Sequence, residues 1–241
     1  LVVVPLAVFI LSCIIAPFFP GLGFFMPVIT RGLKDTNAVA LTFDDGPSPT
    51  TTIPLLNLLK KHSVPAAHFV IGMRAASYPH LIKEILGQGH ELGNHTMGHD
   101  SFLMLRSSAT LGEEISKCQA VLGYYGIAPL AFRPPVGIVN PRLRKQLNKL
   151  GMFCVTFNRR GRDWGNRRVN GIARRIVSRV SAGDIIMLHD CSPKGKMTVG
   201  QWLEEVEETI KGIREKGLKI VPLSDLIGRP VMAVATKGGQ Q

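Results

Sequence analysis

The chain has 241 residues, of which 45% are hydrophobic and 19% are charged. This length suits one domain with a sizeable core plus a targeting segment, and this composition excludes a disordered chain. The formal net charge of +12 favours an anionic environment. Because no zinc-finger spacing or other nucleic-acid-reading motif is present, we expect a membrane surface and no nucleic acid as the partner.

The first thirty residues form an apolar segment. Residues 1–30 carry no charged side chain, and about 20 apolar residues suffice to cross a bilayer. A secretory signal peptide is the alternative, but no basic region precedes the apolar segment, and the segment is longer than the apolar region of a typical signal peptide. We therefore expect a membrane anchor over 1–30 and a short basic linker over 31–37. Arg31 and Lys34 follow the anchor, so the positive-inside rule places the domain on the cytoplasmic face, at a bacterial inner membrane.

From residue 38 onward, short apolar strands alternate with amphipathic helices. The expected strands are 38–43, 67–71, 91–94, 130–133, 153–157, 184–189 and 219–221. The expected helices are 50–62, 78–88, 109–125, 141–150, 168–180, 202–216 and 223–227. This alternation favours parallel strands in an open sheet or a barrel, and about seven such units suit a barrel better. We expect one α/β domain over 38–228 and a tail over 229–241.

Two adjacent carboxylates close the first of these strands. Residues 42–47 read T-F-D-D-G-P, with Asp44 and Asp45 before a Gly–Pro turn. Functional groups collect at the carboxyl ends of strands in α/β proteins. Buried neighbouring carboxylates repel each other, so this pair needs a cation or a shared proton. A solvated turn is the alternative interpretation, since Asp-Gly-Pro favours turns in any case.

A histidine pair favours the cation. Residues 94–99 read N-H-T-M-G-H, which places His95 and His99 four apart, on one side of a helical turn or tight loop. This spacing suits one divalent ion with a carboxylate as third ligand and water completing the site. Because the pair follows a short strand, we expect it to share a rim with the two adjacent carboxylates.

Five segments in this order resemble the motifs of polysaccharide deacetylases. They are T-F-D-D-G-P, H-T-M-G-H, F-R-P-P-V-G at 132–137, R-D-W at 162–164 and M-L-H-D at 187–190. These proteins are also called carbohydrate esterases of family four, or the NodB-homology domain, and the match covers residues 38–227. The resemblance implies a distorted (β/α) barrel, often of seven strands, that removes acetyl groups from sugars with a divalent metal.

The resemblance also implies a metal site and a base. Asp45, His95 and His99 would hold the metal, expected to be Zn²⁺, with Co²⁺, Mn²⁺ or Ni²⁺ as alternatives. Asp44 would be the base that deprotonates water, and a modest base suffices beside a metal. Arg133 would pair with Asp44 and orient it. The alternative for Arg133 is a surface position before a Pro-Pro turn.

The remaining motifs would supply an acid and a substrate pocket. His189 would be the general acid that protonates the leaving amine, oriented by Asp163; a core histidine is the alternative for a residue that ends an apolar strand. The oxyanion would be stabilised by the metal and a backbone N–H of the Arg-Pro-Pro segment. The family usually has an aromatic residue where Val136 stands, so an aromatic wall for the sugar is lost here. The pocket residues implied are Pro134, Pro135, Val136 and Trp164.

The expected function is metal-dependent hydrolysis of an N-acetyl or other N-acyl group from an amino sugar in a polysaccharide, an oligosaccharide or a lipid-linked saccharide. One alternative is a deformylase or deacylase of a polyprenyl-phosphate-linked sugar. Another is a sugar-binding remnant of the fold, but a remnant should have lost Asp44, a metal ligand or His189. Arginines also crowd residues 159–179 around the R-D-W motif; a solvated face or a phosphate-bearing ligand would explain them.

Overall fold

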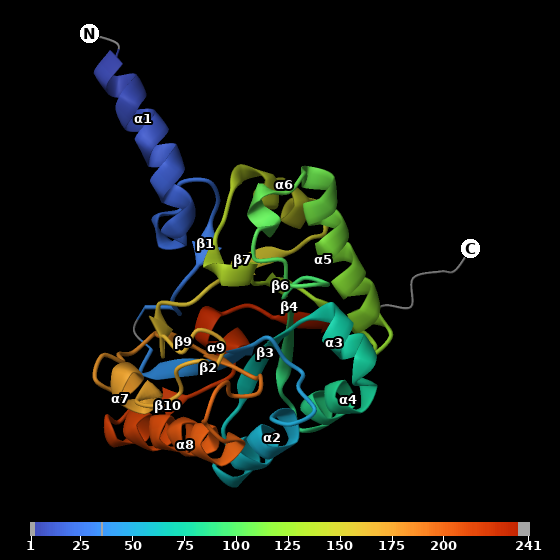
Figure 1. Ribbon diagram of the computed structural model, residues 1–241, viewed down its shortest axis with the longest axis vertical. Helices are drawn as coiled ribbons and strands as arrows, with labels where there is room; N and C mark the ends of the chain where they lie inside the picture. Colours follow the sequence, from blue (N-terminus) through green and yellow to red (C-terminus); the bar gives the residue numbers. More distant parts are fainter. Residues whose placement is uncertain (1–2, 35, 236–241) are drawn as a thin grey trace.

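The computed structural model describes residues 3–34 and 36–235 (Figure 1). Its centre is a parallel sheet in the order β1-β7-β6-β4-β3-β2-β9-β8, with β10 paired to β2. An antiparallel pair, β5 with β11, forms a second small sheet. The strands are β1 Val28–Ile29, β2 Ala38–Asp44, β3 Ala66–Val70, β4 Glu91–Asn94, β5 Ile127–Pro129, β6 Ala131–Phe132, β7 Phe153–Val155, β8 Arg159–Arg160, β9 Ile185–His189, β10 Lys219–Ile220 and β11 Met232–Val234.

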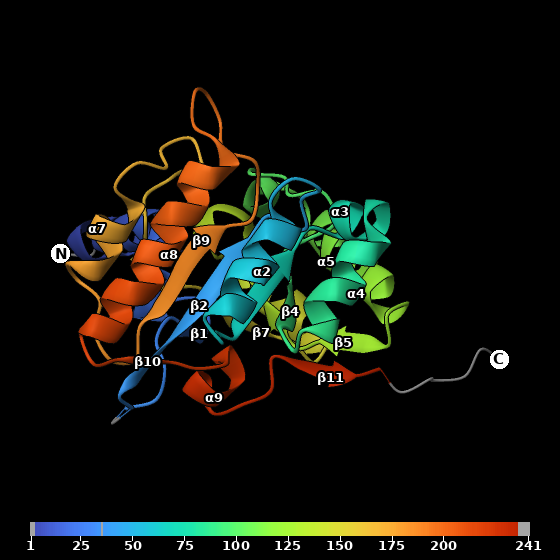
Figure 2. The same ribbon diagram turned by 90° about the horizontal axis from the view of Figure 1, so that it is seen from below.

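Helices surround the sheet (Figures 1 and 2). They are α1 Val3–Ile15, α2 Thr52–Lys61, α3 Gly72–Ser77, α4 Pro79–Gly87, α5 Ser108–Gly123, α6 Pro141–Lys149, α7 Ile172–Val177, α8 Val199–Glu215 and α9 Leu223–Ile227. Figure 2 shows α2 and α8 lying along β2 and β9. The expected parallel α/β architecture is confirmed. The sheet curls without closing into a barrel, however, because its edge strands β1 and β8 form no ladder with one another.

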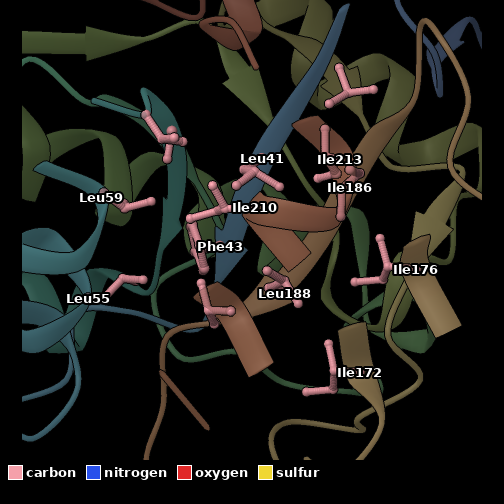
Figure 3. Close-up of a cluster of buried hydrophobic side chains, with 14 of the residues drawn as sticks. Leu41, Phe43, Leu55, Leu59, Ile172, Ile176, Ile186, Leu188, Ile210 and Ile213 are labelled. Carbon is pink, nitrogen blue, oxygen red and sulfur yellow. The ribbon is translucent and has the colours of Figure 1, made fainter. Parts of the chain in front are cut away.

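Strand β2 occupies the middle of the sheet and is buried along all seven residues. It pairs in parallel with β3 on one side and with β9 on the other. Its side chains Leu41 and Phe43 pack with residues of β9 and α8 in the largest apolar cluster (Figure 3). A strand covered on both faces reads as a continuous apolar run, which explains why this segment stood out in the sequence.

The parallel strands bring their carboxyl ends to one edge of the sheet. Strand β2 ends at Asp44, β4 at Asn94, β6 at Phe132 and β9 at His189. Asp44 is in register with His189, and Asn94 with Phe132. Four of the five motifs identified in the sequence therefore lie where these strands end, and the R-D-W motif follows the end of β8, so the loops that carry them meet above a single edge.

The N-terminal segment is shorter and more broken than the expected anchor. In the parts of the chain that the structure describes, no helix combines the length and apolar character needed to cross a membrane. Helix α1 ends at Ile15, and two 3-10 turns with prolines follow, η1 Ala16–Phe18 and η2 Pro20–Leu22. Strand β1, inside the stretch assigned to the anchor, pairs with β7. Residues 1–2 lie outside the described residues.

The expected linker and tail are also partly built into the domain. The backbone N–H groups of Gly32 and Leu33 donate to the carbonyl oxygens of Gly183 and Leu226, and a Cβ at Gly32 would lie 2.5 Å from a carbon of Leu226. Strand β11 lies in the expected tail. The folded unit thus extends at least from 28 to 234, whereas the sequence suggested 38–228. Residue 35 of the linker and residues 236–241 of the tail lie outside the described residues.

Candidate active site

Three candidate metal ligands converge at the carboxyl edge of the sheet. Ligand atoms of Asp45, His95 and His99 lie within 4.8 Å of one another. Asp45 Oδ1 is 3.2 Å from His99 Nε2 and 3.5 Å from His95 Nε2. This carboxylate oxygen is buried, yet it accepts no hydrogen bond from any described residue. A buried oxygen that faces two imidazoles without a hydrogen-bond donor fits a divalent cation between the three side chains.

One hydrogen bond sets the tautomer of His95. Its Nδ1 lies 2.7 Å from the carbonyl oxygen of Arg133. A carbonyl oxygen only accepts, so Nδ1 carries a hydrogen, and Nε2 is the nitrogen that faces Asp45. Metal-binding histidines are commonly oriented in this way by a carbonyl or carboxylate. The ring of His95 is therefore held in the orientation that a metal site requires.

The electrostatic environment also favours the metal-binding forms of the other two residues. Burial alone would raise the pKa of Asp45, but its interaction with His95 and the charges of His189 and His99 outweigh burial and hold the pKa well below its usual range. Burial, followed by the charge of His95, lowers the pKa of His99. An ionised carboxylate and a neutral imidazole are the forms that bind metals.

The turn after β2 sends its two carboxylates in different directions. Asp45 has a φ of 69°, in the left-handed region that non-glycine residues rarely adopt. This turn points Asp45 at the histidines, while Asp44 points at Arg133. Arg74 fastens the turn, because its Nη1 donates to the carbonyl oxygen of Asp45 over 2.7 Å. The two neighbouring aspartates thus occupy separate environments.

Asp44 and Arg133 form a buried ion pair. Arg133 Nη1 lies 2.6 Å from Asp44 Oδ1 and 2.7 Å from Thr42 Oγ1. Arg133 also donates to the carbonyl oxygens of Val155 and Thr156 and stacks over a phenylalanine ring of β3. The second carboxylate oxygen of Asp44 accepts no hydrogen bond within the described part of the chain. One oxygen is therefore fixed, and the other faces the cavity that Asp44 helps to line.

His189 and Asp163 form the second polar pair. His189 Nδ1 lies 2.8 Å from Asp163 Oδ2, and Asp163 is buried. Burial would lower the pKa of His189, but the hydrogen bond and charge of Asp163, with the charges of Asp45 and Asp44, outweigh it and raise the pKa to about 9. The imidazole is therefore protonated at neutral pH, with Nε2 available to a ligand in the cavity.

A cavity of about 930 Å³ joins these groups. Its wall includes the three candidate metal ligands. Asp44, Asp163 and His189 also line it, whereas Arg133 does not. Of the expected pocket residues, Pro134, Val136 and Trp164 line it, whereas Pro135 is buried and does not. Val136 has a φ of 53° and its backbone N–H donates to no described main-chain oxygen. That N–H is available to an oxygen atom of a ligand.

Two residues that support the site were given no role from the sequence. Asp190 is fully buried and accepts hydrogen bonds from Thr51 Oγ1 at 2.7 Å and Thr52 Oγ1 at 2.6 Å, which ties the end of β9 to the start of α2. Burial raises its pKa to about 6, despite these bonds. Asn166 donates to the carbonyl oxygens of His189 and Cys191, which pins the R-D-W loop to β9. Both are common polar residues, and only their partners reveal their roles.

The parallel α/β fold thus brings two histidines and one carboxylate together beside two buried polar pairs in one cavity, an arrangement that suits a metal-dependent hydrolase. Residues 31–155 match the family model described as polysaccharide deacetylase, and the chain belongs to this family. The resemblance noted in the motifs is therefore confirmed, and the protein is a carbohydrate deacetylase.

Relatives and solved structures agree with this assignment. The chain is 34% identical over 191 residues to a peptidoglycan-N-acetylglucosamine deacetylase of Bacillus cereus, covering 78% of this chain and 87% of the relative. It is 32% identical over 202 residues to a chitooligosaccharide deacetylase of a Bradyrhizobium species, covering 80% and 92%. The crystal structure of a peptidoglycan N-acetylglucosamine deacetylase in complex with a naphthyl-substituted N-hydroxybenzamide superposes with a TM-score of 0.77 at 27% identity, covering 85% and 94%.

Proposed function

We propose that the protein uses a divalent metal to hydrolyse the N-acetyl group of an amino sugar within a glycan. The observation that carries this proposal is the convergence of Asp45, His95 and His99 beside a candidate base and a candidate acid in one cavity. The substrate class is supported by the relatives, which are named for deacetylation of peptidoglycan N-acetylglucosamine and of chitooligosaccharides.

The donor set suits a catalytic metal. Two imidazoles and one carboxylate are typical of catalytic Zn²⁺, which keeps an open position for substrate or water. Co²⁺, Mn²⁺ and Ni²⁺ accept the same donors. When bound, such an ion would supply a Lewis acid that makes water more acidic and polarises the acyl carbonyl group.

Asp44 would act as the base. Its free carboxylate oxygen would take the proton of the attacking water, while Arg133 fixes its other oxygen. The backbone N–H of Val136 would donate to the oxyanion that develops on the acyl oxygen. Arg133 would act as a positioning residue for both Asp44 and His95, because its side chain binds the first and its carbonyl oxygen binds the second.

His189 would act as the acid. An amine leaves an amide only as the neutral molecule, so the nitrogen must gain a proton as the C–N bond breaks. The raised pKa keeps a proton on His189 at neutral pH, and Asp163 binds Nδ1, which directs Nε2 into the cavity. The proton would pass from Nε2 to the sugar nitrogen, and acetate and a free amino sugar would result.

The test is acetate release from acetylated chitooligosaccharides and peptidoglycan fragments, with formate release measured in parallel. We expect acetate from at least one of these glycans, loss of activity on chelation and recovery with Zn²⁺. His99→Ala should bind less metal and release less acetate. A sugar-binding remnant of the fold would bind the glycans and release neither acid. That result, or acetate release that survives both chelation and His99→Ala, would overturn the proposal.

A membrane location is a further part of this proposal. Helix α1 exposes large apolar side chains, including Phe9, Ile10 and Leu11, and Phe18 and Phe19 follow it. Burying such a surface in lipid is favourable. We propose that this segment holds the domain at a bacterial inner membrane, with the cytoplasmic face suggested by the basic residues after it. Fractionation with salt and carbonate washes tests this: recovery of the full-length chain in the soluble fraction would contradict it.

A further inference from the structure

A second cavity, of about 440 Å³, lies beside the catalytic one and is walled by arginines. We call it the basic cavity. Six of its eight lining residues are arginines, and none of the eight is acidic. They come from β8, from the R-D-W loop and from α7 with the turn after it. The full set is Asn158, Arg159, Arg160, Arg162, Arg174, Arg175, Ser178 and Arg179.

Most of this positive charge is not neutralised by the protein. Arg159 pairs with Asp184 at 2.9 Å, and Arg175 donates to three carbonyl oxygens of residues 161–170. The other four lining arginines form neither an ion pair nor a side-chain hydrogen bond with the described residues. Glu205 of α8, whose charge acts on Arg175, accepts hydrogen bonds from the backbone N–H groups of Gly171 and Ala173 and forms no ion pair with a cavity arginine. Four guanidinium groups therefore face the basic cavity without a carboxylate partner.

One of the lining arginines is held by the backbone, and the like charges around it lie close together. Arg175 fastens the loop that follows β8 through its carbonyl contacts. Burial and then the charges of Arg168 and Arg174 lower the pKa of Arg175, although the charges of Glu205 and Asp163 oppose this shift. Like charges that lie close together repel one another, and a bound anion would relieve this repulsion.

The basic cavity is continuous with the catalytic one. Arg160 and Arg162 line both cavities, and Arg162 precedes Asp163, the partner of His189. Arg160 is in register with Met187 of β9, two residues before His189. Two residues of a strand span about 7 Å. A ligand with its acylated nitrogen at His189 can thus extend a neighbouring group into the basic cavity.

The chemistry of that group follows from the arginines. Guanidinium groups bind phosphate oxygens in bidentate pairs, and several of them match the charge of a diphosphate better than that of one carboxylate. A neutral glycan offers no partner for them. We propose that the basic cavity is a subsite for a phosphate or diphosphate ester on the acylated amino sugar. This inference rests on the proposed function, which places the sugar at the triad.

The test separates this subsite from the deacetylation itself. Arg174→Gln with Arg179→Gln removes two guanidinium groups that line only the basic cavity. Arg144→Gln with Lys145→Gln removes the same charge from exposed positions of α6, and serves as the control. Inorganic pyrophosphate is titrated into each protein by calorimetry. For each protein, kcat/KM for N-acetylglucosamine 1-diphosphate esters is then compared with kcat/KM for a neutral chitooligosaccharide.

We expect the cavity variant to bind pyrophosphate about tenfold or more weakly per guanidinium removed, and the control to bind as the unmodified protein does. The preference for the diphosphate ester over the neutral glycan should fall by a similar factor. Equal pyrophosphate affinity in both variants would overturn the inference. Deacetylation of neutral glycans with no phosphate preference would overturn it while leaving the proposed function intact. Pyrophosphate binding without deacetylation of any substrate would overturn the proposed function instead.

Two sources of the phosphate are distinguished by the same variants. A soluble nucleotide-linked sugar and a polyprenyl diphosphate-linked sugar in detergent are offered as separate substrates, and the one with the higher kcat/KM identifies the source. Vesicles that contain phosphatidylglycerol but no sugar form the third arm. If the cavity variant loses only vesicle binding, the arginines contact lipid headgroups and the substrate subsite is excluded.

Discussion

Arg133 and Asp44 are joined by a 2.6 Å contact between Nη1 and Oδ1, and both side chains are buried. The same arginine accepts a hydrogen bond from His95 through its carbonyl oxygen. One residue on the loop after β6 thus contacts a residue from the end of β2 and one from the loop after β4. The relative positions of the candidate base and the metal ligands depend on this single side chain and its backbone.

The first prediction concerns this ion pair. Arg133→Met would leave Asp44 buried without a cation, so we expect the free energy of unfolding to fall by about 3–5 kcal/mol. The kcat/KM for deacetylation should fall as well, because Asp44 loses the contact that orients it. Urea denaturation and acetate release measure the two effects.

The control for Arg133→Met is Arg106→Met. Arg106 also has a short contact to a carboxylate, 2.7 Å to Asp100 Oδ2, but both side chains are partly exposed. Exposed pairs contribute little to stability, so this variant should unfold almost as the unmodified protein does. If the two variants lose similar stability, burial does not decide the strength of the Arg133 pair.

The difference in burial between Arg133 and Arg106 could not be predicted from the sequence. The motif around Arg133 predicted its pairing with Asp44, and the structure agrees. The motif did not reveal that the Arg133 side chain is fully buried, because its burial depends on β3, β7 and other segments distant in the chain. Likewise, the long buried run of β2 was plain in the sequence, since central strands are continuously apolar.

Short and edge elements were predicted less well. Helix α3 and strand β8 were not expected, because six and two residues are too few for a periodic pattern. The basic helix expected at 168–180 is only Ile172–Val177, because Gly171 adopts a φ of 77° before it. The sheet remains open because its edge strands β1 and β8 do not pair with one another, and the pairing of strands so distant in the chain leaves no trace in the sequence.

The second prediction separates two adjacent carboxylates. Asp45→Asn should lower bound Zn²⁺ and activity together, because it removes the negative charge of the triad. Asp44→Asn should abolish turnover and leave the metal content nearly unchanged, since its side chain faces Arg133. Metal analysis of the dialysed proteins, with acetate release, checks both. Equal metal loss in the two variants would show that Asp44 also belongs to the metal site.

The third prediction concerns the backbone at Val136. A β-branched residue at a φ of 53° is strained by about 1–2 kcal/mol, and asparagine tolerates this region better. We expect Val136→Asn to raise the free energy of unfolding by about 1 kcal/mol. The control is Val234→Asn, at an exposed position of β11 with ordinary strand geometry, where no gain is expected. A gain in neither variant would show that the turn is not strained.

The last prediction concerns the proton on His189. Because its pKa in the folded protein is raised to about 9 from 6.5, the protonated imidazole stabilises the fold fully below pH 6.5, and this contribution is lost as the pH rises through about 9. Deacetylation should decline over the same alkaline range. Asp163→Asn removes the carboxylate that raises the pKa of His189, so the alkaline limb of the pH profile of kcat/KM should move to lower pH.

The role of this proton is tested by changing the leaving group. His189→Ala should lower kcat on amides by roughly 10²–10⁴-fold, and by less on an activated acetate ester, whose leaving group needs no proton. An alkaline limb unchanged in Asp163→Asn, or equal losses on both substrates, would exclude His189 as the acid.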